Sequence, residues 1–125
     1  MKFFLAWFVS ACFLMGLCAA EKESLNKTID YLIGQVEKSE CKFIRNGDEH
    51  TGKEASEHMR AKYNHFKKEI KTPEDFIAKC ASKSELSGKP YMVRKPDGET
   101  VKCEEWLKSA LDDHRKTLNP AADSK

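Results

Sequence analysis

The chain has 125 residues, of which 22 are Lys or Arg and 20 are Asp or Glu. That length suits one domain with a modest hydrophobic core. Charges so nearly balanced give no electrostatic footprint for nucleic acid or for an anionic membrane surface, so we expect neither as a partner.

The first twenty residues have the pattern of a secretory signal peptide. Met1-Lys2 is a short positive head, Phe3 to Leu17 is almost wholly apolar, and Cys18-Ala19-Ala20 places small residues before a cleavage site. We expect cleavage after Ala20, which places the mature protein in the periplasm or outside the cell. Two alternatives stay open: a retained segment, which would be the protein's contact with a membrane, and lipidation at Cys12.

Cleavage would leave three cysteines, Cys41, Cys80 and Cys103. In an oxidising compartment, three cysteines allow one disulfide bond and one odd thiol, or an intermolecular pair, and the sequence leaves the pairing open. None of them has the C-x-x-C spacing, which disfavours a thioredoxin-like redox motif and a zinc ribbon.

The mature chain begins with a predicted helix and a predicted hairpin. The helix is indicated by apolar residues at helical spacing: Leu25, Ile29, Leu32, Ile33 and Val36. Short strands are predicted at Lys42–Arg45 and Asp48–His50. The Asn46-Gly47 pair between them tolerates the positive φ angles of a type I′ turn, which favours a two-residue hairpin.

Two further helices have clear start signals. Thr51 and Glu54 form a capping box for a helix whose apolar stripe runs to Ile70. Thr72-Pro73 supplies a cap and a proline at the first position of the next helix, which turns Phe76 and its neighbours inward.

The last third of the chain predicts a loop, a second hairpin and a final helix. Ser82–Lys89 is polar, Tyr91–Arg94 and Thr100–Lys102 read as strands, and a helix follows from about Cys103. The fold class is therefore α+β: one small domain over residues 21–118, with about four helices and two short β-hairpins that form a minor antiparallel sheet. Residues 119–125 are predicted to be a flexible tail.

Three stretches in this order carry a family resemblance: FIRNGDEHTGKEASEHMRAKY, TPEDFIAKCASKSELSGKPYMVRKPDGE and EWLKSAL. They resemble the YfeK-like proteins, domain-of-unknown-function family 5329, which are short exported bacterial proteins with no established activity. The resemblance covers nearly all of the mature chain. It implies export to the periplasm and a single domain, and it assigns no catalytic residue.

The histidines do not form a metal motif. Ligation from adjacent helical turns needs His at positions i and i+4, and the chain has no such pair. His58 and His65 share a helix face about 100° from the apolar stripe, so we expect them in solvent. We therefore expect no metal and no cofactor.

An enzymatic alternative rests on three possible nucleophiles, Ser84, Ser87 and Cys103. The serines lie near lysines in a loop without a G-x-S-x-G or S-x-x-K motif. Cys103 lies at a helix start, where the dipole favours a thiolate, but His114 is about three turns away on the same helix. A small periplasmic hydrolase is thus the second hypothesis, and a protein-binding envelope stress accessory is the third.

The leading hypothesis is a non-enzymatic envelope binding or interaction module. Two connectors are rich in hydrogen-bond donors, and if the hairpins share a sheet, Arg45, Asn46, Lys89 and Tyr91 could line one polar surface. Such a surface would suit an anionic or carbohydrate-like envelope component. The competing structural interpretation is that Arg45 and Tyr91 brace the sheet.

Overall fold

The structure, a computed structural model, describes residues 23–119. The predicted signal peptide and residues 120–125 of the predicted tail lie outside these described residues. The elements in chain order are α2 (Leu25–Lys38), β1 (Lys42–Arg45), β2 (Asp48–His50), α3 (Gly52–Phe66), the short 3-10 helix η1 (Lys67–Glu69), α4 (Pro73–Cys80), β3 (Met92–Arg94), β4 (Thr100–Lys102) and α5 (Cys103–Leu118).

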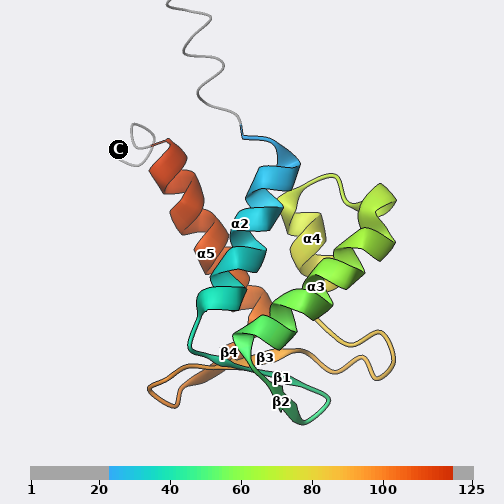
Figure 1. Cartoon of the computed structure of the whole chain (residues 1–125), viewed down its shortest axis with the longest axis vertical. Helices are drawn as coiled ribbons and strands as arrows, with labels where there is room; N and C mark the ends of the chain where they lie inside the picture. Colours follow the sequence, from blue (N-terminus) through green and yellow to red (C-terminus); the bar gives the residue numbers. More distant parts are fainter. Residues whose placement is uncertain (1–22, 120–125) are drawn as a thin grey trace, which may run out of the picture.

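Within the described range, four α-helices lie on one side of a four-stranded antiparallel sheet (Figure 1). The strand order is β2-β1-β3-β4, so the two hairpins join through the β1–β3 pair. This pairing confirms the predicted α+β class and the predicted union of the two hairpins in one sheet.

Local sequence signals set the element boundaries. The capping boxes are present at α3, between Thr51 and Glu54, and at α4, between Thr72 and Asp75. Asn46 and Gly47 both have positive φ, 53° and 85°, as a type I′ turn requires. Two boundaries differ from the prediction. Helix α3 ends at Phe66, where the chain tightens into η1 before Ile70, and β3 begins at Met92 rather than at Tyr91.

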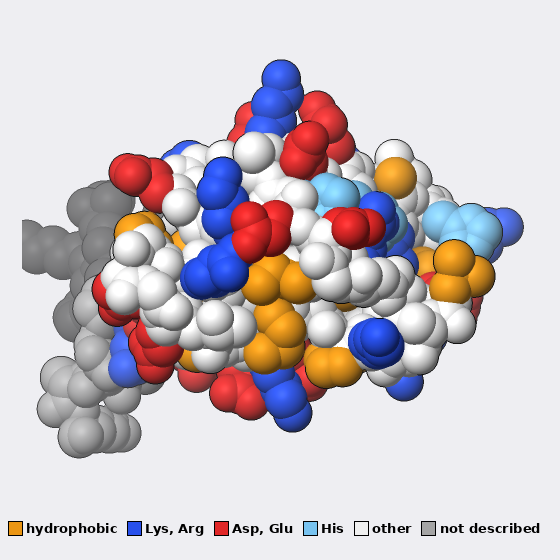
Figure 2. Space-filling model, turned by 90° about the horizontal axis from the view of Figure 1, so that it is seen from below, with side chains coloured by type: hydrophobic (Ala, Val, Ile, Leu, Met, Phe, Trp, Pro, Cys, Tyr) orange, Lys and Arg blue, Asp and Glu red, His pale blue; other side chains and the backbone are white. Residues whose placement is uncertain are grey.

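The two faces of the sheet differ because successive side chains of a strand point to opposite sides. Phe43 and Val93 are register partners that face the helices and are buried. The core they join is formed mainly by Ile29, Leu32, Ile33 and Val36 of α2, Phe76 and Ile77 of α4, and Leu107 and Leu111 of α5. The next pair, Ile44 and Met92, faces away from the helices. Figure 2 shows this outer face, with hydrophobic side chains near its middle and charged ones around them.

The three cysteines of the described chain are all unpaired and buried. Cys80 and Cys103 have no exposed surface, and Cys41 is 8% exposed. No helix in residues 23–119 combines the length and the apolar character needed to cross a membrane.

Candidate functional site

Arg45, at the end of β1, and Tyr91, immediately before β3, lie on the helix-covered side of the sheet. Arg45 lies two residues after Phe43, and Tyr91 lies two residues before Val93, so both share the inward direction of those buried residues. The backbone of Tyr91 is held on both sides: its N–H donates to Ser82 and its carbonyl accepts from Cys103. The pairing of β1 with β3 therefore brings together two side chains that are far apart in the sequence.

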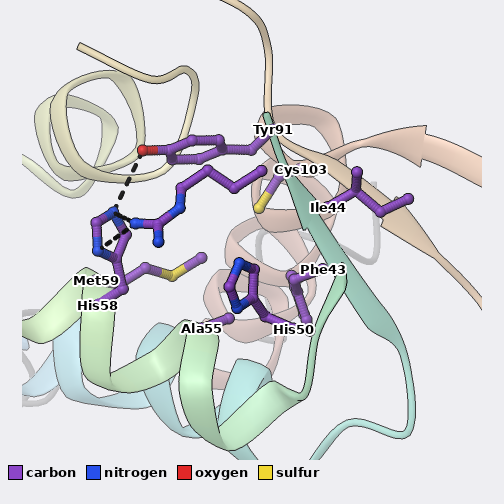
Figure 3. A pocket seen from close by; sticks show the side chains of 9 residues that line it. Phe43, Ile44, His50, Ala55, His58, Met59, Tyr91 and Cys103 are labelled. Atoms are coloured by element: carbon purple, nitrogen blue, oxygen red, sulfur yellow. Dashed lines mark hydrogen bonds between the residues drawn. The ribbon is translucent and has the colours of Figure 1, made fainter. Parts of the chain in front are cut away.

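Helix α3 supplies the facing side chains, His58 and Lys62. Residues four apart on a helix lie one above the other on the same face, so His58 and Lys62 point in the same direction. Both are half-buried. They cover the ends of Arg45 and Tyr91 from above the sheet (Figure 3 shows His58 and Tyr91).

The four side chains form one hydrogen-bonded cluster, which we call the Arg45 cluster: Arg45, His58, Lys62 and Tyr91. Arg45 Nη1 lies 2.8 Å from His58 Nδ1 and 2.9 Å from Nε2. Tyr91 Oη lies 3.3 Å from His58 Nε2 and 3.4 Å from Lys62 Nζ. One tautomer gives three hydrogen bonds: Arg45 donates to Nδ1, Nε2–H donates to Tyr91 Oη, and Lys62 donates to the same oxygen. The approach of Arg45 Nη1 to Nε2 is then a contact without a hydrogen bond. The proton of Tyr91 is then available to a ligand.

His58 is neutral in this cluster. Burial of the ring, followed by the positive charges of Arg45 and Lys62, lowers the pKa of His58 from 6.5 to about 4. Only a neutral imidazole has a nitrogen lone pair that can accept from Arg45. The ring therefore separates two cations without adding a third positive charge at neutral pH.

Neither cation of the cluster forms an ion pair with any carboxylate in residues 23–119. By contrast, the two arginines on helices, Arg60 and Arg115, are paired with Asp30 and Glu74. Two half-buried cations without a directly paired carboxylate make a site that favours a negatively charged ligand, because their charged donors are free to bind it.

The Arg45 cluster borders an open depression of about 300 Å³, which we call the outer cavity. Its rim is formed by Asn46 and by the loop after α4, including Ser84 and the 97% exposed Leu86. Asp48 and Glu85 also line it. Hydrogen bonds join the β1–β2 turn to the loop after α4 at this rim. Asn46 Nδ2 donates to Ser84 Oγ at 3.3 Å, and Asn46 Oδ1 accepts from the Ser87 hydroxyl.

Three of the four residues proposed from the sequence meet at this cavity: Arg45, Asn46 and Tyr91 line it. Lys89 does not. It is exposed, and it joins the loop through its backbone, donating to Ser87 Oγ and accepting from Ser84 N–H.

The sequence interpretation missed His58 and Lys62. The expectation that His58 is solvated was wrong, because its helix face is covered by β1 and by Tyr91. Only the i, i+4 spacing of a histidine and a lysine off the apolar stripe could have indicated a shared face, and many exposed helices have such pairs.

The proposed nucleophiles lack the surroundings that catalysis needs. Cys103 is fully buried, and that burial raises its pKa to about 12, so it is a thiol rather than a thiolate at neutral pH. Ser84 is 5% exposed and its oxygen accepts from Asn46 and from the backbone N–H groups of Leu86 and Ser87. No side-chain base contacts Ser84 or Ser87 among the residues described.

A second, smaller hollow adjoins the first, and we call it the inner cavity. It has a volume of about 30 Å³ and an almost entirely apolar lining, to which Phe43, Ala55, Met59 and Cys103 contribute. Arg45, His58 and Tyr91 line both hollows.

No group of three or more His, Cys, Asp or Glu side chains placed to hold a metal ion occurs in the part of the chain that the structure covers.

Comparisons with known proteins identify a family and a sequence relative. A family model described as a family of unknown function, DUF5329, matches residues 23–115. The chain is 40% identical over 73 residues to the uncharacterized protein YfeK of Salmonella typhimurium, a match that spans 58% of this chain and 58% of that relative. No solved structure matches the chain.

Proposed function

The chain belongs to the DUF5329 family, whose function is unknown, and from the geometry of its own site we propose that it is a non-enzymatic binding module for an anionic component of the bacterial cell envelope. The family match confirms the resemblance found in the sequence. The signal-peptide pattern of residues 1–20 supports export, so the mature protein would work in the periplasm or outside the cell.

The observation that carries this proposal is the pair of cations without a protein anion. Arg45 offers the planar fork of donors that suits a carboxylate or phosphate, and Lys62 adds a second positive charge from the facing helix. Tyr91 contributes a hydroxyl proton. A ligand anion at the outer cavity would supply the direct ion pair that no carboxylate in residues 23–119 makes with Arg45 or Lys62, although Asp48 and Glu85 line the same cavity.

The alternatives find less support in the geometry. A hydrolase needs an activated nucleophile, and the buried thiol of Cys103 and the base-free hydroxyls of Ser84 and Ser87 do not supply one. A protein-binding accessory needs an exposed apolar patch. The large hydrophobic side chains exposed in residues 23–119 are Leu86, in the loop after α4, and Leu118, at the end of α5. The hydrophobic middle of the outer sheet face includes Ile44 and Met92, which are half-buried.

The test is a nuclear magnetic resonance titration of the mature protein, first with inorganic phosphate and then with soluble cell-wall fragments. We expect both to move the side-chain signals of Arg45 and Tyr91. Lys62→Gln should weaken phosphate binding about tenfold or more, because it removes one charge-assisted hydrogen bond.

The matched control is Lys102→Gln, which removes an exposed lysine from the outer face of the sheet. It should leave the affinity almost unchanged at moderate salt, since screening limits the reach of a distant charge. The proposal fails if neither titrant moves the Arg45 and Tyr91 signals, or if the two lysine variants lose affinity equally.

A further inference from the structure

The inner cavity lies next to the anion site. Arg45, His58 and Tyr91 line both the inner and the outer cavity. Figure 3 shows the side chains of Met59, Ala55 and Cys103 around it, with Ile44 directed to the other side of the strand. A ligand held by Arg45 would therefore have an apolar hollow next to its anionic group.

The inner cavity suits a small apolar group better than it suits water. Its volume of about 30 Å³ is enough for one or two groups the size of a water molecule or a methyl. A buried water needs two to four polar partners to be held well. Among the described residues, the one buried side-chain polar atom that lacks a hydrogen bond is His50 Nε2, and Figure 3 shows His50 at this cavity. The surface that faces the cavity is otherwise almost entirely apolar, so a water there would be held poorly.

The size and the apolar lining of the cavity thus limit the ligand. A branch of one or two carbons fits, and a longer chain does not, because Phe43, Met59 and Cys103 are buried core residues and leave no further space. The anionic group and this branch must be adjacent in the ligand, since the two hollows share their lining.

We propose that the ligand's anionic group is a carboxylate that carries a methyl- or ethyl-sized substituent, with the carboxylate at Arg45 and Lys62 and the substituent in the inner cavity. The C-terminal alanine of a peptide has this chemistry. The inference rests on the proposed anion-binding function and adds the class of anion to it.

A series of simple carboxylates at pH 7 measures the size limit. We expect affinity for the mature protein to rise from formate to acetate to propionate by about fourfold for each carbon that is buried. We expect no further rise from propionate to pentanoate, because the longer chain cannot enter the cavity. Equal affinity for formate and propionate would overturn the inference.

The location is tested by comparing phosphate with propionate in the wild-type protein. Both should move the side-chain signals of Arg45, whereas propionate alone should also move the methyl signal of Met59 and the ring signals of His50. If both anions move Arg45 and neither moves Met59, the inference fails and the anion-binding function stands. If neither anion moves Arg45, the proposed function itself fails.

A cavity-filling variant provides an independent test. Ala55→Val adds two methyl groups to a buried position that lines the inner cavity. It should abolish the preference of propionate over formate while leaving phosphate affinity within about twofold of wild type. Unchanged preference in a folded variant would contradict the inference. If the variant does not fold, the effect of propionate and of phosphate on the Met59 methyl signal of the wild-type protein still tests the inference.

Discussion

His58 is a neutral histidine held between two cations, and that position makes the fold sensitive to acid. Its pKa is about 4 in the folded protein and 6.5 in the unfolded chain, because of burial and of the neighbouring Arg45 and Lys62. The unfolded state therefore binds the proton more readily, and the stability linked to His58 is lost as pH falls from 6.5 towards 4. After allowance for solvent screening of a half-exposed ring, we expect a loss of about 1 kcal/mol between pH 7 and pH 5.

Urea unfolding at pH 7 and pH 5 measures this loss, and His58→Gln is the reference because glutamine keeps hydrogen-bonding groups but does not titrate. The wild type should lose about 1 kcal/mol more than the variant over this range. The other histidines and the carboxylates are common to both proteins, so their titration cancels in the difference. Equal losses would show that His58 is not perturbed in the way described.

Asn46 has two separate roles at its position, which two substitutions distinguish. It adopts a φ of 53° in the hairpin turn, and its amide holds the rim of the outer cavity through Ser84 and Ser87. Asn46→Gly keeps the backbone conformation and removes the amide, which should cost roughly 0.5–1 kcal/mol of unfolding free energy. Asn46→Ala removes the amide and adds the strain of positive φ, so it should cost about 1 kcal/mol more. Urea denaturation gives both values, and a glycine variant as unstable as the alanine variant would contradict the turn-strain argument.

At the scale of elements, the junction of α2 and α3 depends on a glycine. A Cβ atom at Gly52 would lie 2.3 Å from the carbonyl oxygen of Val36, so the N-terminus of α3 can approach the end of α2 only without a side chain. Gly34, inside α2, serves as the control, because a Cβ atom added there would meet no atom within 4 Å. We expect Gly52→Ala to destabilise the protein by about 2 kcal/mol or more, and Gly34→Ala to stabilise it by roughly 0.5–1 kcal/mol through helix propensity. Thermal unfolding should show shifts of opposite sign; two shifts of the same sign would refute the close-approach explanation.

The same elements show what the sequence could predict. The caps at Thr51 and Thr72 and the Asn46-Gly47 turn depend on residues within three or four positions of one another, so their signals are readable in the chain. The need for glycine at position 52 depends on a carbonyl of another helix and leaves no local signal. His58 was assigned to solvent for a related reason: the helical period tells which residues leave the core stripe, but not whether a strand and a loop cover them.

At the scale of the whole molecule, the buried thiols report on global unfolding. Cys80 and Cys103 lie in the core with no exposed surface, and burial raises their pKa values to about 11 and about 12. A thiol reacts with an aromatic disulfide reagent as its thiolate. In the folded protein we therefore expect almost no labelling of either cysteine, and rapid labelling of both in denaturant.

The dependence of labelling on stability separates a structural thiol from a catalytic one. If reaction requires the domain to open, Gly34→Ala should slow the labelling of Cys80 and Cys103 alike by about two- to fivefold, since its added stability of roughly 0.5–1 kcal/mol lowers the open population by that factor. Gly52→Ala should speed both by more. A nucleophile serving a hydrolase would instead react from the folded state, at a rate that neither glycine variant changes. Labelling of Cys103 alone, at a rate that does not depend on stability, would therefore favour the hydrolase hypothesis over the binding module.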